Sequence, residues 1–257
     1  MVTKISIITV CYNSASTIRD TLRSVADQTH PHIEHIIVDG GSSDETVSLV
    51  QQYRRHSGPL VSEPDRGIYD AMNKGLALAS GDVVGFLNSD DAYADTNVLS
   101  RVAEVFAMQT VDACYGDLVY VAANNPNRVV RYWRSRPYQP GLCSRGWMPA
   151  HPTFYVRRQA YQRYGGFDDS LRIAADFEIC LRLLEVQRLR VTYLPGVLVR
   201  MRTGGVSNAS LRNVVRSNRE VAQALRKHGF PAGLPLILGK LASKLAQLRW
   251  SLMAPRV

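Results

Sequence analysis

Short apolar runs alternate with segments of helical periodicity through the first ninety residues, and this alternation limits the possible folds more than any other feature. The runs at 5–10, 33–38, 60–61 and 82–87 are rich in β-branched residues, which is typical of strands buried on both faces. Between the runs, apolar residues recur at helical spacing, as in Ile18, Leu22 and Val25. Regular alternation of strand and helix predicts an α/β fold on a mostly parallel sheet with right-handed crossovers.

Beyond residue 110 the pattern is less regular. It predicts strands at 113–115, 118–121, 129–133, 154–156, 191–194 and 197–199. It also predicts a helix that carries Phe177, Cys180 and Leu184 on one face. In the first half, Ser42 and Glu45 have the spacing of a capping box and predict that a helix begins there.

Polar side chains follow the predicted strands of the first half at the point where each strand ends. Asn13, Asp39 and Asp65 follow the first three, and Asp90 with Asp91 follows the fourth. Because open α/β sheets bind ligands at the carboxyl ends of their strands, these residues predict a binding site along one edge. Asp and Asn also favour turns and helix caps, so each residue taken singly has a structural alternative.

Two common phosphate-binding loops are missing from the sequence. The turn after the first strand, Val10 to Ser14, has no glycine, which excludes the Gly-x-Gly-x-x-Gly loop of a dinucleotide-binding dehydrogenase. A phosphate loop ending in Gly-Lys-Ser/Thr is also missing. What remains is a site where carboxylates hold a divalent cation and the cation holds a diphosphate.

Several motifs occur in a fixed order. Residues 5–13 read ISIITVCYN, residues 37–46 read IVDGGSSDET, and residues 88–91 read NSDD. Together they resemble family 2 of the inverting, nucleotide-sugar-dependent glycosyltransferases, which implies the GT-A fold, a three-layer α/β sandwich. Residues 62–75, SEPDRGIYDAMNKG, resemble the branch that builds bacterial exopolysaccharide and O-antigen repeat units, and residues 172–178, RIAADFE, resemble the family's acceptor-side acidic motif. The resemblance covers about residues 4–205.

This resemblance implies roles for individual residues. The side chains expected to bind the nucleotide are Thr9, Tyr12, Asn13, Asp39, Asp65, Arg66, Lys74 and Asp90. Of these, Asp39 would contact the base or ribose and Asp65 the base. Lys74 or Arg66 would meet the phosphates.

The pair Asp90 and Asp91 corresponds to the family's Asp-x-Asp motif, which implies a Mn2+ or Mg2+ cofactor. Asp91 is the expected direct metal ligand, and Asp90 would contact the metal, the ribose or the donor sugar. Asn88 stands where many relatives have an aspartate. Its carbonyl oxygen can still contact the metal or donor, but it brings no charge.

On the acceptor side, the resemblance makes Asp176 the candidate general base that takes the proton of the acceptor hydroxyl. Its alternative role is that of a first-turn residue that stabilises a helix N-terminus. His151, in the segment MPAHP, matches a histidine often found near the donor phosphates or the acceptor. A lone histidine beside two prolines is also typical of a structural position.

The formal net charge of +9 is unevenly distributed along the chain. Residues 1–95 carry 7 Lys/Arg against 13 Asp/Glu, residues 96–205 carry 15 against 8, and residues 206–257 carry 9 against 1. The basic C-terminal half indicates an anionic partner. A membrane surface fits better than nucleic acid, because no nucleic-acid-binding motif accompanies the charge.

The C-terminal region predicts two helices. The first runs from Leu211 past Leu225 and ends at Gly229. The second has an apolar stripe opposite Lys240 and Lys244, as in a helix lying on an anionic membrane, although packing on the catalytic domain or another subunit is the alternative. Its stripe comprises Ile237, Leu241, Leu245, Leu248 and Leu252.

The family's processive synthases carry a Gln-x-x-Arg-Trp motif. Here Ala246 stands in place of the glutamine before Arg249 and Trp250, which favours transfer of a single sugar. We expect a GT-A catalytic domain over 1–205, with 1–95 binding the nucleotide and 96–205 facing the acceptor. A basic helical appendage over 206–257 would follow it.

The four cysteines are far apart and form no Cys-x-x-Cys pair, which argues against a zinc site or disulfide framework and favours a reducing compartment. The chain begins with a strand where a signal peptide would lie, and no window is long and apolar enough to span a membrane. The sequence predicts a cytoplasmic protein, peripheral on the inner face of the cell membrane.

The expected function is metal-dependent, inverting, hexosyltransferase-type transfer from a nucleoside-diphosphate sugar to a saccharide or lipid-linked acceptor in cell-surface polysaccharide biosynthesis. A sugar-phosphate nucleotidyltransferase would need a Gly-rich, Arg-containing loop that residues 11–16 do not provide. A non-catalytic nucleotide-sugar-binding or membrane scaffold protein finds support only in Asn88. The nucleotide base, both sugars and the oligomeric state stay open at this point.

Overall fold

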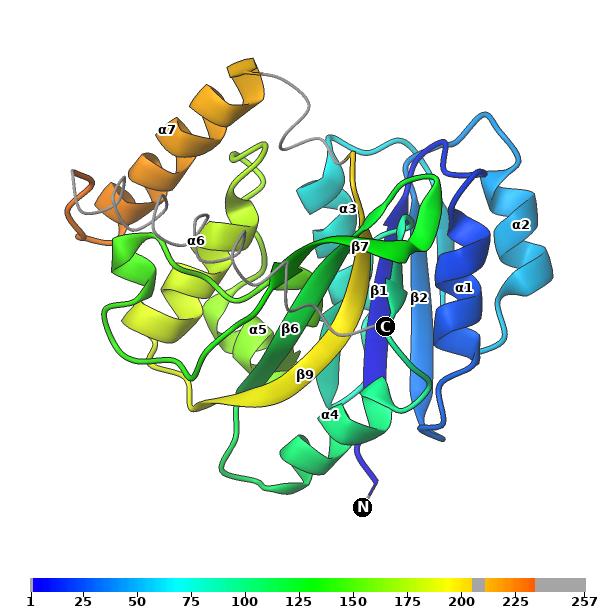
Figure 1. Cartoon of the computed structure of the whole chain (residues 1–257), viewed down its shortest axis with the longest axis horizontal. Helices are drawn as coiled ribbons and strands as arrows, with labels where there is room; N and C mark the ends of the chain where they lie inside the picture. Colours follow the sequence, from blue (N-terminus) through cyan, green and yellow to red (C-terminus); the bar gives the residue numbers. More distant parts are fainter. Residues whose placement is uncertain (1, 205–210, 234–257) are drawn as a thin grey trace.

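The structure of the protein is a computed structural model that describes residues 2–204 and 211–233. Within them, a nine-stranded sheet has the order β3-β2-β1-β4-β8-β6-β9-β5, with β7 paired to β6. Helices lie on both faces of this sheet (Figure 1). The α/β three-layer architecture expected from the sequence is therefore confirmed.

The first half is the regular one. Its strands are β1 (Ile5–Cys11), β2 (Ile33–Asp39), β3 (Leu60–Ser62) and β4 (Val83–Phe86). The helices between them are α1 (Ile18–Ala26), α2 (Thr46–Tyr53) and α3 (Ile68–Leu78). The pairs β1–β2, β2–β3 and β1–β4 are parallel, and every residue of β1 and β2 is buried. Burial on both faces explains the continuous apolar runs of the sequence.

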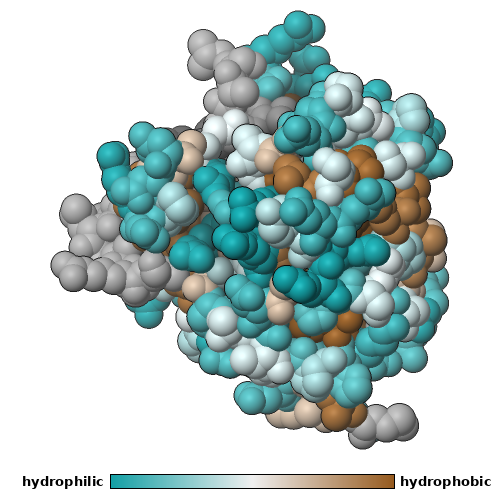
Figure 2. All heavy atoms as spheres, turned by 90° about the vertical axis from the view of Figure 1, so that its right-hand side faces the viewer, coloured by the Kyte–Doolittle hydropathy of each residue, from teal (hydrophilic) through white to brown (hydrophobic). Residues whose placement is uncertain are grey.

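Alternating side chains of β1 pack on opposite faces of the sheet. Ile8 belongs to the core beneath α3, whereas Cys11 packs with Ile18 of α1 and Val50 of α2. Helix α3 can approach β1 closely because Gly75 has no side chain. A β-carbon at this position would lie only 2.4 Å from Cγ2 of Ile8. Figure 2 shows that polar side chains dominate the outer face on the α1 and α2 side, as expected for amphipathic helices.

The second half has mixed pairing. Its strands are β5 (Asp91–Tyr93), β6 (Ala113–Ala122), β7 (Asn125–Trp133), β8 (Tyr155–Arg157) and β9 (Val191–Arg202). Only β6–β9 among their described pairings is parallel. The helices are α4 (Val98–Ala107), α5 (Arg158–Tyr164) and α6 (Ala175–Leu181), the last continuing as a π-helical segment, Arg182–Val186.

Two pairs of predicted strands prove to be single strands. The predicted pieces at 113–115 and 118–121 form β6, and those at 191–194 and 197–199 form β9. The register between β6 and β9 shifts near Gly116, where a β-carbon would meet Leu198 at 2.5 Å. This irregularity breaks the apolar pattern without ending either strand. The sequence analysis did not anticipate β5, α4 or α5.

The predicted capping box at the start of α2 is wrong. Helix α2 begins at Thr46, and the Ser42 hydroxyl donates to Asp39 instead of to the helix. The backbone N–H of Thr46 donates to Oδ1 of Asp44 at 3.0 Å. Asp44, and not Ser42, therefore accepts from a backbone donor at the start of this helix.

The predicted C-terminal helix is present as α7 (Leu211–Lys227), followed by Gly229 at φ 78°. Val221, Ala224 and Leu225 are buried in the same core as α3 and α6. Helix α7 therefore packs on the core that α3 and α6 share. The second helix expected at 237–252 lies outside the described residues. Among residues 2–204 and 211–233, no helix is long and apolar enough to cross a membrane.

Candidate functional site

The loops that follow β1, β2 and β4 are bonded to one another at the carboxyl edge of the sheet. The backbone N–H of Asn13 donates to Oγ of Ser42 at 2.8 Å, and Oδ1 of Asn13 accepts from the N–H of Ser43 at 2.9 Å. Ser89, after β4, bonds to Ser14 at 2.9 Å. Asn13 adopts φ 47°, a left-handed conformation that asparagine tolerates. The predicted edge is therefore one connected surface.

Tyr12, Gly40 and Asp65 converge on this edge. A β-carbon at Gly40 would lie 2.5 Å from Oδ2 of Asp65 and 3.4 Å from Cδ2 of Tyr12, so only glycine leaves room for both side chains. Tyr12 is 64% exposed, unusually high for a large apolar ring. An exposed ring beside a carboxylate offers a stacking face and a hydrogen-bond acceptor to a nucleobase.

Two residues expected to bind the nucleotide lie inside the protein. Thr9 is fully buried, and its hydroxyl is 3.0 Å from Nε2 of His35. Asp39 is also fully buried, and its oxygens accept from the N–H of Gly41 and of Ser42. Burial by itself would raise the pKa of Asp39, but these hydrogen bonds outweigh it and lower the pKa. Asp39 thus shapes the loop that carries Gly40.

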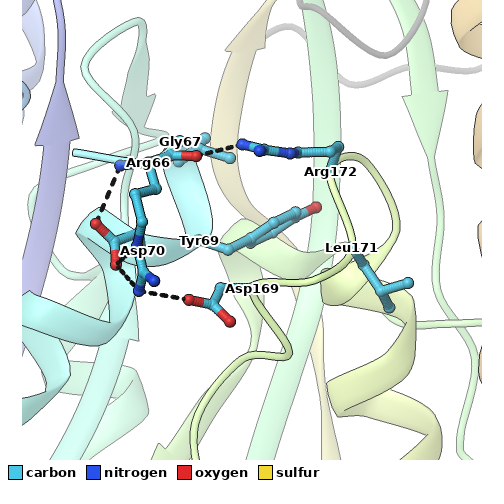
Figure 3. Close-up of a pocket in the computed structure, with 8 residues that line it drawn as sticks. Arg66, Gly67, Tyr69, Asp70, Asp169, Leu171 and Arg172 are labelled. Carbon is cyan, nitrogen blue, oxygen red and sulfur yellow. Dashed lines mark hydrogen bonds and ion pairs between the residues drawn. The ribbon is translucent and has the colours of Figure 1, made fainter.

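The two predicted phosphate-binding side chains lie near the start of α3 and are ion-paired. Lys74 contacts Oε1 of Glu63 at 2.7 Å, while Arg66 contacts Asp70 at 2.7 Å and Asp169 at 2.8 Å. Figure 3 shows these arginine contacts at a pocket that Tyr69, Leu171 and Arg172 also line. The pocket joins the start of α3 to the loop before α6.

Asp91 lies at the start of β5 and is buried, with 1% of its surface exposed. Neither of its carboxylate oxygens has a hydrogen-bond partner within the described residues. Burial raises the pKa of Asp91 well above its ordinary value, and the charge of Asp90 raises it further. Burial also raises the pKa of Asp90, although Arg202 acts in the opposite direction. Asn88 is half-buried, and its backbone carbonyl accepts from the N–H of Asp91 at 3.1 Å.

These residues fit a divalent cation that is shared with a ligand. No group of three or more His, Cys, Asp or Glu side chains in the described part of the chain could hold a metal by itself. However, Mg2+ typically binds one or two carboxylates and takes its other ligands from substrate phosphates and water. Two unpartnered oxygens on Asp91, with Asp90 adjacent, match this donor set.

Asp176 lies in the first turn of α6, where its Oδ1 accepts from the N–H of Phe177 at 2.8 Å. The hydroxyl of Tyr69 is 3.4 Å from the same oxygen and donates to the carbonyl of Ile173 at 2.8 Å. Tyr120, on β6, is affected by the charges of both Asp176 and the candidate metal ligand Asp91. Burial raises the pKa of Tyr120, and the charges of Asp91 and Asp176 raise it further. The charges of both carboxylates therefore act on one phenol, against the opposite effect of Arg131.

The sequence analysis missed Glu220, which fixes the start of α6. Its Oε2 accepts from the N–H groups of Arg172, Ile173 and Ala174 at 3.1, 2.8 and 3.0 Å. Burial would raise the pKa of Glu220, but these bonds and one from Arg216 lower it. Glu220 is the sole acidic residue of region 206–257. A single carboxylate in a basic segment was the sequence feature that could have indicated a specific role for it.

His151 lies in an aromatic cluster. Its ring centroid is 5.6 Å from that of Phe86 and 5.4 Å from that of Phe167, and only 7% of the residue is exposed. Burial lowers the pKa of His151 to about 4, so the ring is neutral at pH 7. Its Nε2 has no hydrogen-bond partner among the described residues. The structure therefore places His151 in the aromatic core, where its ring contacts Phe86 and Phe167.

Comparison with known proteins assigns this arrangement to a class. The model of glycosyl transferase family 2 matches residues 6–169. The chain belongs to this family of glycosyltransferases. It is 32% identical over 184 residues to an uncharacterized glycosyltransferase of Mycobacterium tuberculosis, covering 69% of this chain and 68% of the relative. It is 30% identical over 208 residues to a PGL/p-HBAD biosynthesis glycosyltransferase of Mycobacterium bovis, covering 79% and 78%.

Solved structures confirm the GT-A fold. The mannosyltransferase PcManGT from Pyrobaculum calidifontis, in complex with GDP-Man and Mn2+, has a TM-score of 0.65 at 20% identity, covering 98% of this chain and 73% of that one. TarS of S. aureus has a TM-score of 0.64 at 18% identity. This chain spans only 44% of the length of TarS.

Proposed function

We propose that the protein transfers one sugar, with inversion, from a nucleoside-diphosphate sugar to a hydroxyl of a saccharide or lipid-linked acceptor. The observation that carries this proposal is the buried carboxylate of Asp91, whose two oxygens have no hydrogen-bond partner within the described residues, together with the carboxylate of Asp176 at the start of α6. Asp91 would bind the cation that holds the donor diphosphate, and Asp176 would face the acceptor hydroxyl.

Binding would begin at the edge of the sheet. The exposed ring of Tyr12 would stack on the base, and Asp65 would accept a hydrogen bond from it. Asp91 would hold Mn2+ or Mg2+ together with Asp90. When bound, the cation offsets the negative charge that develops on the diphosphate as it leaves. The solved neighbours that contain GDP-Man with Mn2+, or UDP-GlcNAc, support a donor of this class.

Transfer needs a base on the acceptor side. Asp176 would accept the proton of the acceptor hydroxyl while that oxygen forms a bond to the anomeric carbon. The bond from the anomeric carbon to the diphosphate oxygen breaks in the same step, and the nucleoside diphosphate leaves. Tyr69 would keep the Asp176 carboxylate in place, since its hydroxyl lies 3.4 Å from Oδ1. Attack opposite the leaving group gives inversion.

We assign the reaction to the synthesis of a cell-surface glycan such as an exopolysaccharide or O-antigen unit, on the cytoplasmic side of the membrane. The support is the PGL/p-HBAD biosynthesis relative together with the 62–75 segment. The basic C-terminal region would hold the protein at anionic lipid, and the second helix predicted from the sequence lies outside the described residues.

The decisive experiment compares Asp176→Asn with the wild type. Donors are screened with Mn2+ by release of nucleoside diphosphate, and affinity for the nucleoside diphosphate is measured by thermal shift. We expect turnover to fall by about 100-fold or more with nucleotide affinity unchanged, because general-base catalysis contributes on that order. Unchanged turnover would remove Asp176 from the mechanism. Failure of every donor in the wild type would favour a non-catalytic binding protein.

A further inference from the structure

The acceptor side carries an excess of arginine that no carboxylate offsets. Between Asp117 and Asp168 the chain has eight arginines and no aspartate or glutamate. Some have structural roles, such as Arg157, whose Nε donates to the carbonyl of Val111 at 2.6 Å. Arg131, on β7, has no ion pair within the described residues, and its Nε is buried without a hydrogen-bond partner. An unpaired buried donor costs free energy unless a ligand satisfies it.

Two aromatic rings hold the guanidinium of Arg131. Its Cζ lies 4.1 Å from the ring centroid of Tyr120 and 5.9 Å from that of Trp133. Cation–π contacts of this kind fix the side chain in place but do not pair its N–H groups. The guanidinium is therefore ordered in advance for an anion, which lowers the entropic cost of binding one.

Strand pairing places Arg131 on the same face of the sheet as Asp91. Asp91 pairs with Met201, Met201 pairs with Tyr120, and Tyr120 pairs with Arg131. Residues paired in this way project to one face. Three strand spacings separate Asp91 from Arg131, a distance of about 14 Å. Arg131 lies over the ring of Tyr120, and the charges of Asp91 and Asp176 act on the same phenol, so Arg131 borders the proposed reaction centre.

We propose that Arg131 binds a phosphate group of the acceptor, as a phosphate ester or diphosphate attached to the sugar that receives the new residue. This inference rests on the proposed function, because Asp91 and Asp176 mark the donor and the base. Arg131 stands at the opposite end of the row from Asp91, with Met201 and Tyr120 between them, so it borders the centre on the side away from the donor cation. The planar guanidinium matches phosphate oxygens with two parallel hydrogen bonds.

The test uses farnesyl diphosphate as the probe, with the donor site filled by Mg2+ and the nucleoside diphosphate that stabilises the protein most. Binding is measured by calorimetry for the wild type, Arg131→Gln and Arg128→Gln. Arg128 is an exposed arginine on the same strand, so its variant removes an equal charge. We expect Arg131→Gln to weaken binding by about tenfold or more, and Arg128→Gln to change it by less than about twofold. The unfolding midpoint of each variant confirms that it folds.

Several results would overturn the inference. The first is that the wild type does not bind the probe. The second is that both variants lose the same affinity for the probe. The third is that Arg131→Gln weakens the binding of neutral farnesol as much as that of farnesyl diphosphate. A loss of nucleoside diphosphate affinity in Arg131→Gln would assign Arg131 to the donor. If Arg131→Gln released the protein from phosphatidylglycerol vesicles yet still bound the probe, the phosphate would be that of a lipid headgroup. Binding of the nucleoside diphosphate to the wild type is measured separately. If the wild type binds none, that result contradicts the proposed function and not the role of Arg131.

Discussion

The two halves of the molecule differ in how completely their buried polar groups are satisfied. Among the described residues, every buried side-chain nitrogen or oxygen without a hydrogen-bond partner belongs to residues 91–200. In the first ninety residues, buried groups such as Asp39 and Glu34 have several partners each. Unsatisfied buried groups are rare in folded proteins, and each needs an explanation such as a bound water, an ion or a catalytic role. The first ninety residues are thus satisfied by their own hydrogen bonds, whereas residues 91–200 hold the buried polar groups that lack a partner within the described protein.

The largest effect that this comparison predicts is at Asp91. Asp91→Asn should lower metal-dependent transfer by about 100-fold or more, because the cation loses its charged ligand. The same variant should not lower the unfolding midpoint without metal, since it replaces a buried carboxylate that has no partner. Activity assays with Mn2+ and thermal melts in chelator test both points. A large fall in the midpoint would show that Asp91 is structural.

Acid should destabilise the protein through its neutral, buried histidines. The pKa of His151 is lowered to about 4 by burial, whereas in the unfolded chain it returns to its ordinary value near 6.5. The unfolded state therefore binds the extra proton first, and stability falls as pH decreases from 6.5 to 4, by as much as about 3 kcal/mol. His151→Gln should flatten this dependence in urea unfolding measured across that range. His32→Gln, at an exposed site, is the control and should leave the slope unchanged.

Glu220 tests whether α7 supports the acceptor side. Glu220→Gln should lower the free energy of unfolding by about 2 kcal/mol, because three backbone N–H groups lose a charged acceptor. Turnover should fall with nucleotide affinity kept, since the affected loop leads into Asp176. The control, Arg216→Gln, removes only the partly exposed partner of Glu220 and should cost less than about 1 kcal/mol. Equal effects of the two variants would contradict the role given to Glu220.

The smallest expected effect is at the donor edge. Tyr12→Ala should weaken nucleoside diphosphate binding by roughly fivefold to tenfold, because stacking on a base contributes on the order of 1 kcal/mol. Since Tyr12 is exposed, the unfolding midpoint should not change. Tyr12→Phe keeps the ring and should bind as the wild type does. If Phe were as weak as Ala, the hydroxyl and not the ring would make the contact.

The sequence alone determined the regular half. Continuous β-branched runs at 5–10 and 33–38 form β1 and β2 because a strand buried on both faces needs apolar residues throughout. Polar residues after those strands meet at one edge because parallel strands end on the same side. The sequence could not tell that Asp39 lies beneath this edge while Tyr12 lies on it, since that depends on how the loops bond to each other.

Tertiary structure alone decided how the proposed reaction centre is assembled. The β6–β7 hairpin carries Tyr120 and Arg131, and Asp91 joins their row only because β9 pairs with both β5 and β6. Glu220 reaches the start of α6 from 46–48 residues away. Contacts of such long range leave no periodicity in a sequence, because periodicity reports only which face of its own element a residue occupies.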